Sequence, residues 1–300
     1  MSKIIVIGSS NTDMVIKSKR LPLPGETILG GNFLMNAGGK GANQAVAAAR
    51  LDGNVTFVTK TGNDMFGTEA LLLFEKEGID IRFIIKDAEN PSGVALITVD
   101  EKGENSIVVA PGSNGTLSAY DIKDEIFETG NSDLFLMQLE IPVTTVEFVA
   151  QKAASKGNRV ILNPAPAMQL PDDLLRYLFL ITPNETEAEL LTGIKVHDIV
   201  TAEKAASILL DKGVENVIIT MGASGAYIHS NTLSKLIPVI PVTAVDTTAA
   251  GDVFNGALAV AISEGKDLEE AVIFANKAAS ISVTRMGAQA SAPYRKEISY

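Results

Sequence analysis

Cysteine and tryptophan are absent from this 300-residue sequence, and histidine occurs only as His197 and His229. Without cysteine, the chain can have no disulfide scaffold, cysteine nucleophile or cysteine-ligated zinc. Two histidines leave little from which to build a histidine metal centre or a Ser/His/Asp triad, and no Gly-x-Ser-x-Gly turn occurs. Any chemistry must therefore depend mainly on carboxylates and backbone groups.

Positive charge is also scarce, because 25 lysines and arginines face 36 aspartates and glutamates, a net charge of −11. A duplex of phosphates would meet net repulsion, so we expect no nucleic-acid partner. No apolar run approaches the roughly 18 residues of a membrane span, and Ile4–Gly8 is too short for the core of a signal peptide. The sequence predicts a cytoplasmic protein with no membrane partner.

Strand and helix patterns alternate along most of the chain, which is long enough to bury roughly three quarters of its unfolded surface. Short runs rich in β-branched residues are apolar on consecutive positions, as in strands covered on both faces; they lie at 4–7, 55–59, 134–138, 159–163, 178–182 and 216–221. Amphipathic helical patterns lie at 41–51, 68–77, 143–156, 186–193, 202–212 and 268–284. This alternation predicts an α/β fold, a doubly wound and mostly parallel sheet with helices on both faces.

Two segments, 14–35 and 91–111, break the alternation and have the pattern of antiparallel hairpins. Neither is followed by a helix that could cover it. We expect them to form one small β-subdomain whose uncovered face must bury a ligand, a second subunit, or both.

A run of small residues, Asp246–Asp252, leads into the apolar helical stretch 253–262. Backbone N–H groups of residues 249–252 would then lie at a helix N-terminus, where they can hold an anion. Asp252 could simply stabilise the first turn of the helix. Beside an anion site, however, a carboxylate is placed to take a proton from a hydroxyl during phosphoryl transfer.

A second glycine-rich segment, Asn36–Ala45, lacks the spacing of a Walker A phosphate loop. Gly38 and Gly39 allow close backbone approach at the start of a helix, and Lys40 and Asn43 share one face of its first turn. The pair suits recognition of a small hydroxylated ligand, although a glycine-rich entry to a well-packed helix is the simpler interpretation.

Further polar residues follow predicted strands, at the edge where open α/β sheets bind ligands. Asn11 and Asp13 follow the first strand without a dinucleotide-binding glycine pattern, and Glu140 follows another. Asn184 and Glu187 could organise water around Mg²⁺, or could be the two halves of a helix capping box. The glycine-rich turn 220–225 could lie along a nucleotide.

Taken together, several of these segments resemble the ribokinase family of carbohydrate kinases. The segments that carry the resemblance are Gly38–Gln44, Asn163–Pro166, Thr182–Glu187 and Asp246–Asp252. Their order and spacing match the family over essentially the whole chain, from Gly8 to Pro293. The two family signatures, Gly38–Gln44 and Asp246–Asp252, occur in the right order, which is far more specific than either motif alone.

The resemblance implies a single α/β kinase domain over residues 1–300, with a small β-sheet lid formed by about 14–35 and 91–111. The lid of the family also forms a homodimer interface. The implied reaction is ATP-dependent phosphorylation of D-ribose at O5 to give D-ribose 5-phosphate and ADP. The implied cofactors besides ATP are Mg²⁺ and, as activator, K⁺ or another monovalent cation.

The resemblance also implies roles for individual residues. Asp252 would be the base, with Ala249, Ala250 and Gly251 as the anion hole. The sugar would be held by Asn11, Asp13, Gly39, Lys40, Asn43, Glu140 and Asp252. The nucleotide would be bound by Asn184, Thr220, Gly222, Ser224, Gly225, Gly251 and Asn276, with Glu187 acting on Mg²⁺ through water. The K⁺ site would use Asp246, Thr248, Ser282, Arg285, Gly287 and Ser291, several of them through backbone carbonyls.

Two positions depart from the wider family pattern. Ala250 stands where many members have glycine, and Asn276 stands where some have histidine. Neither touches the expected base. The sequence leaves open a kinase for 2-deoxyribose, fructose or a nucleoside, and a catalytically silent protein that binds sugar or nucleotide.

Overall fold

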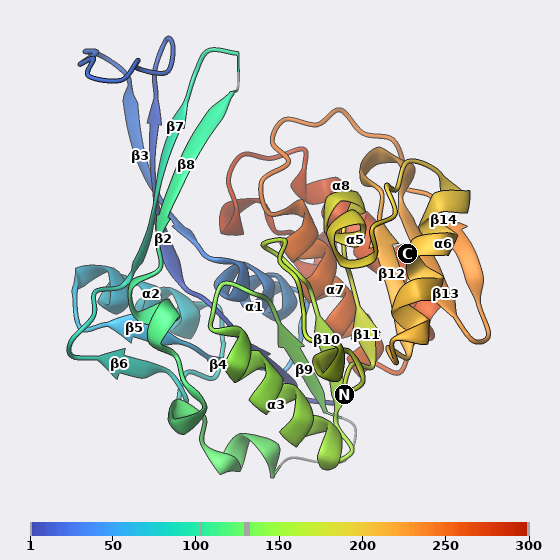
Figure 1. Ribbon diagram of the computed structural model, residues 1–300. Coiled ribbons are helices and arrows are strands. Elements are labelled where there is room, and N and C mark those ends of the chain that lie inside the picture. The colour runs from blue at the N-terminus through green and yellow to red at the C-terminus, as the bar shows by residue number, and fades with distance from the viewer. Residues whose placement is uncertain (1, 103, 129–132, 299–300) are drawn as a thin grey trace.

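The apolar runs form the centre of an eight-stranded sheet in the computed structural model, which describes residues 2–102, 104–128 and 133–298 (Figure 1). The strand order is β14-β13-β12-β11-β10-β9-β1-β4, parallel except at the β12–β13 and β13–β14 pairs. The bounds are β1 Ile4–Ile7, β4 Val55–Val58, β9 Leu134–Met137, β10 Arg159–Leu162, β11 Leu180–Ile181, β12 Asn216–Thr220, β13 Ala226–Ser230 and β14 Ser234–Ile237. The predicted doubly wound sheet is confirmed, and β13 and β14 extend it.

Helices cover both faces of this sheet (Figure 1). One core joins Ile4 and Val6 of β1 to α1, α2, α7 and α8, and a second core joins Ile5 and Ile7 to the other helices. Alternate residues of one strand thus serve opposite cores, because successive side chains point to opposite faces. The bounds are α1 Lys40–Arg50, α2 Met65–Lys76, α3 Val143–Ser155, α4 Asp172–Leu175, α5 Glu185–Thr192, α6 Ile199–Asp211, α7 Ala250–Ser263 and α8 Leu268–Ser282.

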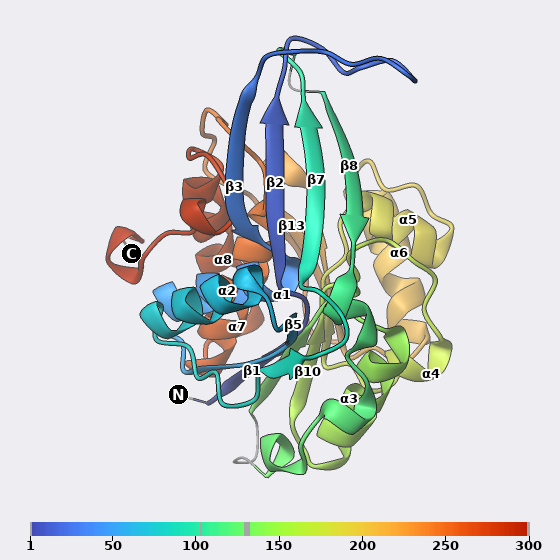
Figure 2. The ribbon, with the colours of Figure 1, turned by 90° about the vertical axis from the view of Figure 1, so that its left-hand side faces the viewer.

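The two helix-free segments come together in a separate four-stranded sheet that stands away from the α/β body (Figure 2). Its order is β3-β2-β7-β8, with β2 and β7 parallel; the bounds are β2 Asn11–Lys17, β3 Asn32–Gly38, β7 Gly93–Val99 and β8 Asn105–Ala110. Gly103, between β7 and β8 in sequence, lies outside the described residues. The first of the two segments is longer than the predicted 14–35, because β2 begins at Asn11 and β3 ends at Gly38. Asn11 and Asp13 therefore lie within β2. A smaller two-stranded sheet pairs β5 (Lys60–Gly62) with β6 (Ile85–Asp87).

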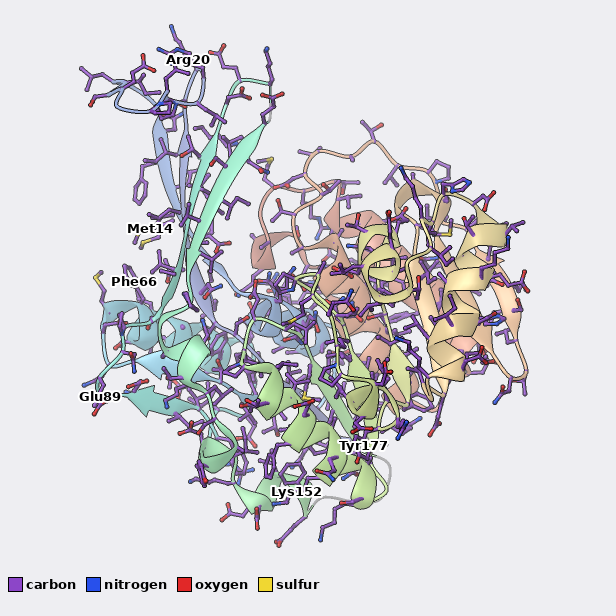
Figure 3. The ribbon with its side chains drawn as sticks, in the orientation of Figure 1. Met14, Arg20, Phe66, Glu89, Lys152 and Tyr177 are labelled. Atoms are coloured by element: carbon purple, nitrogen blue, oxygen red, sulfur yellow. The ribbon has the colours of Figure 1, made fainter. Side chains whose placement is uncertain are left out.

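The four-stranded sheet has one face toward the body and one face away from it. Met14 points away from the body, on the same side as Phe66 of α2 (Figure 3). The register places the side chains of this outer face together: Met14, Ile16, Phe33, Met35, Leu96 and Val108. Asp13 lies on the opposite, inner face. Across residues 2–102, 104–128 and 133–298, no helix has the length and apolar character needed to cross a membrane.

Candidate active site

Most of the polar residues singled out in the sequence meet at the carboxyl edge of the main sheet. The loops after β1, β9, β10, β11 and β12 all lie at this edge, where open α/β sheets bind ligands. A cavity of about 360 Å³ opens there. Among the residues that line it are Lys40, Asn163, Asn184, Glu187, Thr220, Gly222, Gly225, Thr247, Ala249, Ala250, Gly251, Asp252 and Asn276.

The start of α7 forms one wall of this cavity. Ala249 precedes the helix with φ of 60°, a left-handed conformation that costs an L-residue about 1–2 kcal/mol. Such strain persists where the surrounding structure requires a particular backbone geometry. A left-handed residue next to right-handed helical residues is the backbone pattern of an anion nest, and residues 249–252 line the cavity. Of the predicted anion-hole donors, the Ala250 N–H also donates to the carbonyl oxygen of Thr247 at 3.2 Å.

Asp252 lies in the first turn of α7 and is only 5% exposed, yet it also lines the cavity. Its Oδ2 accepts a hydrogen bond from Nδ2 of Asn43 at 2.9 Å, and its Oδ1 accepts one from Nε2 of Gln44 at 3.0 Å. Burial raises the pKa of the Asp252 carboxyl, while Lys40 and the two amide donors act in the opposite direction. A buried carboxylate with a raised pKa is suited to accept a proton from a substrate.

Lys40 is surrounded by carboxylates. Burial opposes its charged form, but Asp252, Glu140 and Glu187 together raise the pKa of the Lys40 ammonium. Asp13 belongs to the same group, because burial and the charges of Glu140 and Asp252 raise its pKa to about 6. The site thus places one cation among four acids.

The predicted sugar-binding residues are brought together around the start of α1. Gly39 has φ of +88°, and a Cβ atom there would lie 2.7 Å from the backbone nitrogen of Asn11, so only glycine allows this approach between α1 and β2. Glu140 Oε2 accepts hydrogen bonds from the Lys40 backbone N–H at 2.9 Å and from the Ser9 hydroxyl at 2.5 Å. Asn43 reaches Asp252 directly, which joins this group to the cavity.

The predicted nucleotide-binding residues line the cavity, except for Ser224. Ser224 ends the 3₁₀ turn Gly222–Ser224, next to lining residues Gly222 and Gly225. Asn276 of α8 is 6% exposed, and its Nδ2 donates to the carbonyl oxygen of Ile237 at 3.0 Å. This contact fixes α8 against the end of β14.

Asn184 and Glu187 form the capping box that the sequence allowed. The Asn184 side chain accepts from the Glu187 N–H at 2.8 Å, and Glu187 Oε2 accepts from the Asn184 N–H at 2.9 Å. Both residues also line the cavity, and burial raises the pKa of Glu187. Among the described residues, no cluster of three or more acidic or histidine side chains could hold a metal ion by itself.

Asp246 connects the two loops predicted to hold a monovalent cation. Its carboxylate accepts from the N–H groups of Thr248 at 2.9 Å and Gly287 at 2.8 Å. Burial favours the neutral form, but these bonds lower the pKa of Asp246. The buried hydroxyls of Ser282 and Ser291 donate to the carbonyl oxygens of Ala279 and Ala288, and Arg285 pairs with Glu297. These hydrogen bonds join the loop of Asp246 and Thr248 to that of Gly287, whereas the contacts of Ser282, Arg285 and Ser291 lie within the C-terminal segment.

Sequence reasoning missed several buried amide side chains that support the site through hydrogen bonds. Gln44 and Gln138 are fully buried and hydrogen-bonded to each other. Gln44 belongs to a segment that carries the family resemblance, but no role was predicted for either side chain. Asn114 was also missed: its Nδ2 donates to Oδ1 of Asn11 at 2.7 Å and so fixes that amide. The available signal was the occurrence of amide side chains within otherwise apolar segments, such as Gln44 before Ala45–Ala49.

Comparison with known proteins agrees with this geometry. The model of the "pfkB family carbohydrate kinase" matches residues 1–295. A ribokinase of Haemophilus influenzae is 47% identical over 98% of this chain and 96% of its own length. A deoxyribokinase of Salmonella typhi is 38% identical over 97% and 95% of the two chains. The structure of Arabidopsis thaliana ribokinase complexed with ribose and ATP is similar with a TM-score of 0.92 and 33% identity, over 98% and 96% of the two chains.

The family model and the relatives all span nearly the full chain, and Lys40, Asn163, Asn184 and Asp252, which come from the four segments that carry the resemblance, line one cavity. The doubly wound sheet and the added four-stranded sheet have the architecture of the ribokinase structure. The chain belongs to the pfkB family of carbohydrate kinases.

Proposed function

We propose that this protein transfers the γ-phosphoryl group of ATP to O5 of D-ribose, giving D-ribose 5-phosphate and ADP. The observation that carries the proposal is the placement of Asp252, a buried carboxylate in the first turn of α7, in one cavity with Lys40 and the predicted nucleotide residues. The 47% identity to a ribokinase over nearly the whole chain supports ribose as the sugar.

In the proposed reaction, Asp252 accepts the proton of the O5 hydroxyl as O5 forms a bond to the γ-phosphorus. The bond between the γ-phosphorus and the bridging oxygen of ADP breaks in line with this attack. Backbone donors at residues 249–251 and the charge of Lys40 stabilise the transferring group. Asn11, Asp13, Gly39, Asn43 and Glu140 hold the sugar hydroxyls, so that O5 is presented to Asp252.

Mg²⁺ fits this site as a partner of the substrate phosphates, because it is usually bound through water and one or two carboxylates. Glu187 would hold it through water, and Mg²⁺ would neutralise charge on the phosphates. Oε2 of Glu187 is engaged in the capping box, so Oε1 is the oxygen that would face this water.

A monovalent cation such as K⁺ fits between the loops joined by Asp246. The carbonyl oxygen of Val283 accepts hydrogen bonds from the N–H groups of Val245 and Asp246, at 2.7 and 3.1 Å. These bonds hold the loop before α7 against the C-terminal end of α8. With Asp246 engaged by Thr248 and Gly287, backbone carbonyls and hydroxyls of the loops are the oxygens left to bind the cation. The proposed cation site consists of Asp246, Thr248, Ser282, Arg285, Gly287 and Ser291.

We expect turnover to be higher in K⁺ than in a salt of a large cation such as tetramethylammonium at equal ionic strength. The cation would order the loops next to Thr247 and Ala249, which line the cavity. Steady-state rates in the two salts test this. Equal rates across the concentration range would contradict the cation site and leave the phosphoryl-transfer proposal intact.

The four-stranded sheet would act as the lid of a single kinase domain, with segments 14–35 and 91–111 as its core. Its inner face carries Asp13 and so covers the sugar, while closure would exclude water that could otherwise accept the phosphoryl group. Its outer face would pack on a second copy of the chain, because large apolar side chains such as Phe33 and Val108 are 60% and 66% exposed there. A cytoplasmic location remains a prediction.

We expect ADP release to depend on ribose, and we expect the rate with ribose to exceed the rate with any other sugar. The panel is D-ribose, 2-deoxy-D-ribose, D-fructose and a nucleoside, each with ATP and Mg²⁺ in a coupled ADP assay. The kinship to a deoxyribokinase makes 2-deoxyribose the alternative that the panel must separate. A higher kcat/KM for 2-deoxyribose would reassign the sugar, and no sugar-dependent ADP release would mean a silent binding protein.

A further inference from the structure

We propose that Gln44 is a positioning residue for Asp252, and that Asn163 and Gln138 fix the orientation of the Gln44 amide. The inference rests on the proposed role of Asp252 as base. Gln44 lies on α1, is fully buried, and contacts the Asp252 carboxylate without itself lining the cavity.

The Gln44 side chain makes three hydrogen bonds. Its Nε2 donates to Oδ1 of Asp252 at 3.0 Å and to Oδ1 of Asn163 at 3.1 Å. Its Oε1 accepts from Nε2 of Gln138 at 2.6 Å. Four elements, α1, α7 and the ends of β9 and β10, therefore meet at one amide.

The orientation of this amide is dictated by a backbone carbonyl. The carbonyl oxygen of Thr182 can only accept, so Asn163 must turn its Nδ2 toward it, at 3.2 Å. Oδ1 of Asn163 then faces Gln44 and requires a donor there. Gln44 must present its NH₂ group to Asn163, and the same NH₂ group reaches Asp252.

Asn43, which holds the other carboxylate oxygen, is not constrained in this way. Its Nδ2 donates to Oδ2 of Asp252, but its own Oδ1 is buried and has no hydrogen-bond partner among the described residues. The Asn43 amide can therefore turn over when a ligand arrives, whereas the Gln44 amide cannot. Oδ1 of Asp252 is the anchored oxygen, and Oδ2 is the oxygen free to take the substrate proton.

Gln44 also affects the charge of Asp252. A donated hydrogen bond favours the ionised carboxylate, whereas burial favours the neutral form. The charged groups near Asp252 from the other elements are Lys40, Glu140, Asp13 and Glu187. Lys40 acts in the same direction as Gln44, and the three acids act against it.

Replacing Gln44→Met keeps the side-chain length and removes the amide. We expect kcat to fall by about 10- to 100-fold, the range expected when a hydrogen bond to a charged group is lost. The acidic limb of the kcat profile should move to higher pH by about one to two units, because the carboxylate loses a donor. KM for ATP should stay near the wild-type value, since Gln44 does not line the nucleotide cavity.

Gln138→Met tests the proposal without touching Asp252. Gln44 keeps its donor group but loses the partner of Oε1, so we expect a smaller shift of the acidic limb in the same direction. The double variant should lose less than the product of the two single losses, because both act through one contact. If Gln44→Met does not fold, Gln138→Met still carries the test.

Asn158→Leu is the matched control. Asn158 is also a buried amide, at 7% exposure, but it precedes β10 at the end opposite Asn163. We expect its loss to change stability without moving the acidic limb. A shift as large as that of Gln44→Met would mean that any buried amide has this effect, and would overturn the proposal.

The titration of the Asp252 carboxyl provides a readout independent of turnover. Carboxyl-carbon NMR of aspartate-labelled protein, with Asp252→Asn to assign the signal, should give a higher pKa in Gln44→Met than in the wild type. An unchanged pKa and an unchanged acidic limb would overturn the positioning role. A shifted pKa in a protein without ribose-dependent turnover would support it and refute the proposed function instead.

Discussion

Replacing Asp252→Asn is expected to lower kcat for ribose phosphorylation by about 10²- to 10⁴-fold, the usual contribution of a general base. The introduced amide has nearly the same shape but cannot accept the O5 proton. Asn11, Asp13 and Glu140 would still hold the sugar hydroxyls, so sugar binding should change much less than turnover. Steady-state rates, with ribose binding by calorimetry, measure the two effects separately.

Asp198→Asn is the control for the alternative that Asp252 only stabilises a helix start. Asp198 is the N-cap of α6, and its side chain accepts from the Thr201 N–H at 2.8 Å. Asparagine caps a helix about as well as aspartate, so activity and stability should both stay near wild type. If Asp252→Asn were equally silent, the carboxylate would be structural and the assignment of the base wrong.

Asp252→Asn should also raise the free energy of unfolding at neutral pH. Burial raises the pKa of folded Asp252 above the unfolded value of about 3.9, so the protonated carboxyl favours folding. This contribution is complete below the unfolded pKa and is lost as pH rises through the folded pKa. An amide at this position does not titrate, so the gain of the variant over the wild type should grow as pH rises above the unfolded pKa and become constant above the folded pKa.

The local hydrogen bonds can accommodate this change. Gln44 continues to donate to the remaining carbonyl oxygen, and Asn43 can turn its unpartnered Oδ1 toward the introduced NH₂ group. Urea denaturation at several pH values measures the difference. A variant that loses both stability and activity at pH 8 would contradict the view that Asp252 is kept at an energetic cost for its chemistry.

The sequence was most informative where one chemical requirement fixes a short segment. The consecutive apolar residues of Ile4–Ile7 require cover on both faces and predict a buried strand, and the alternation of strand and helix patterns places it in a doubly wound sheet. Gly39 followed by Lys40 predicts a close helix entry with a cation on its first turn, as observed. Asp252 could be singled out because a carboxylate among small residues at a helix start is unusual.

The parts that could not be predicted depend on tertiary neighbours. Gln44, Gln138 and Asn163 lie far apart in sequence, and no periodicity shows that their amides meet. The left-handed conformation of Ala249 likewise follows from its surroundings, since alanine has no local preference for it. The antiparallel strands β13 and β14 were missed because the polar residues at 229–235 interrupt the apolar pattern of an edge hairpin.

Replacing Phe33→Asp is expected to convert the proposed dimer into a monomer. Phe33 lies on the outer face of the four-stranded sheet, and its side chain is 60% exposed in the single chain. In a twofold dimer the substitution occurs on both sides of the interface. With about 2 kcal/mol lost for each buried anchor, the dissociation constant should rise by about 10³-fold.

Tyr120→Asp is the control, because Tyr120 is a fully exposed aromatic residue outside the four-stranded sheet. Sedimentation equilibrium should give twice 31.6 kDa for the wild type and the control, and 31.6 kDa for Phe33→Asp. A wild-type protein of 31.6 kDa would refute the dimer. Dimers of all three proteins would place the interface elsewhere.

Loss of the dimer should affect the sugar more than the nucleotide. Phe33 pairs with Ile16 across the β2–β3 register, and β2 carries both Asn11 and Asp13. The nucleotide cavity is built from the α/β body and contains no residue of the four-stranded sheet among the described residues. If the second copy supports this sheet over the sugar, Phe33→Asp should raise KM for ribose while KM for ATP stays nearly constant. An equal rise of both would mean that the variant disturbs the α/β body, because only that part of the molecule is common to the two sites.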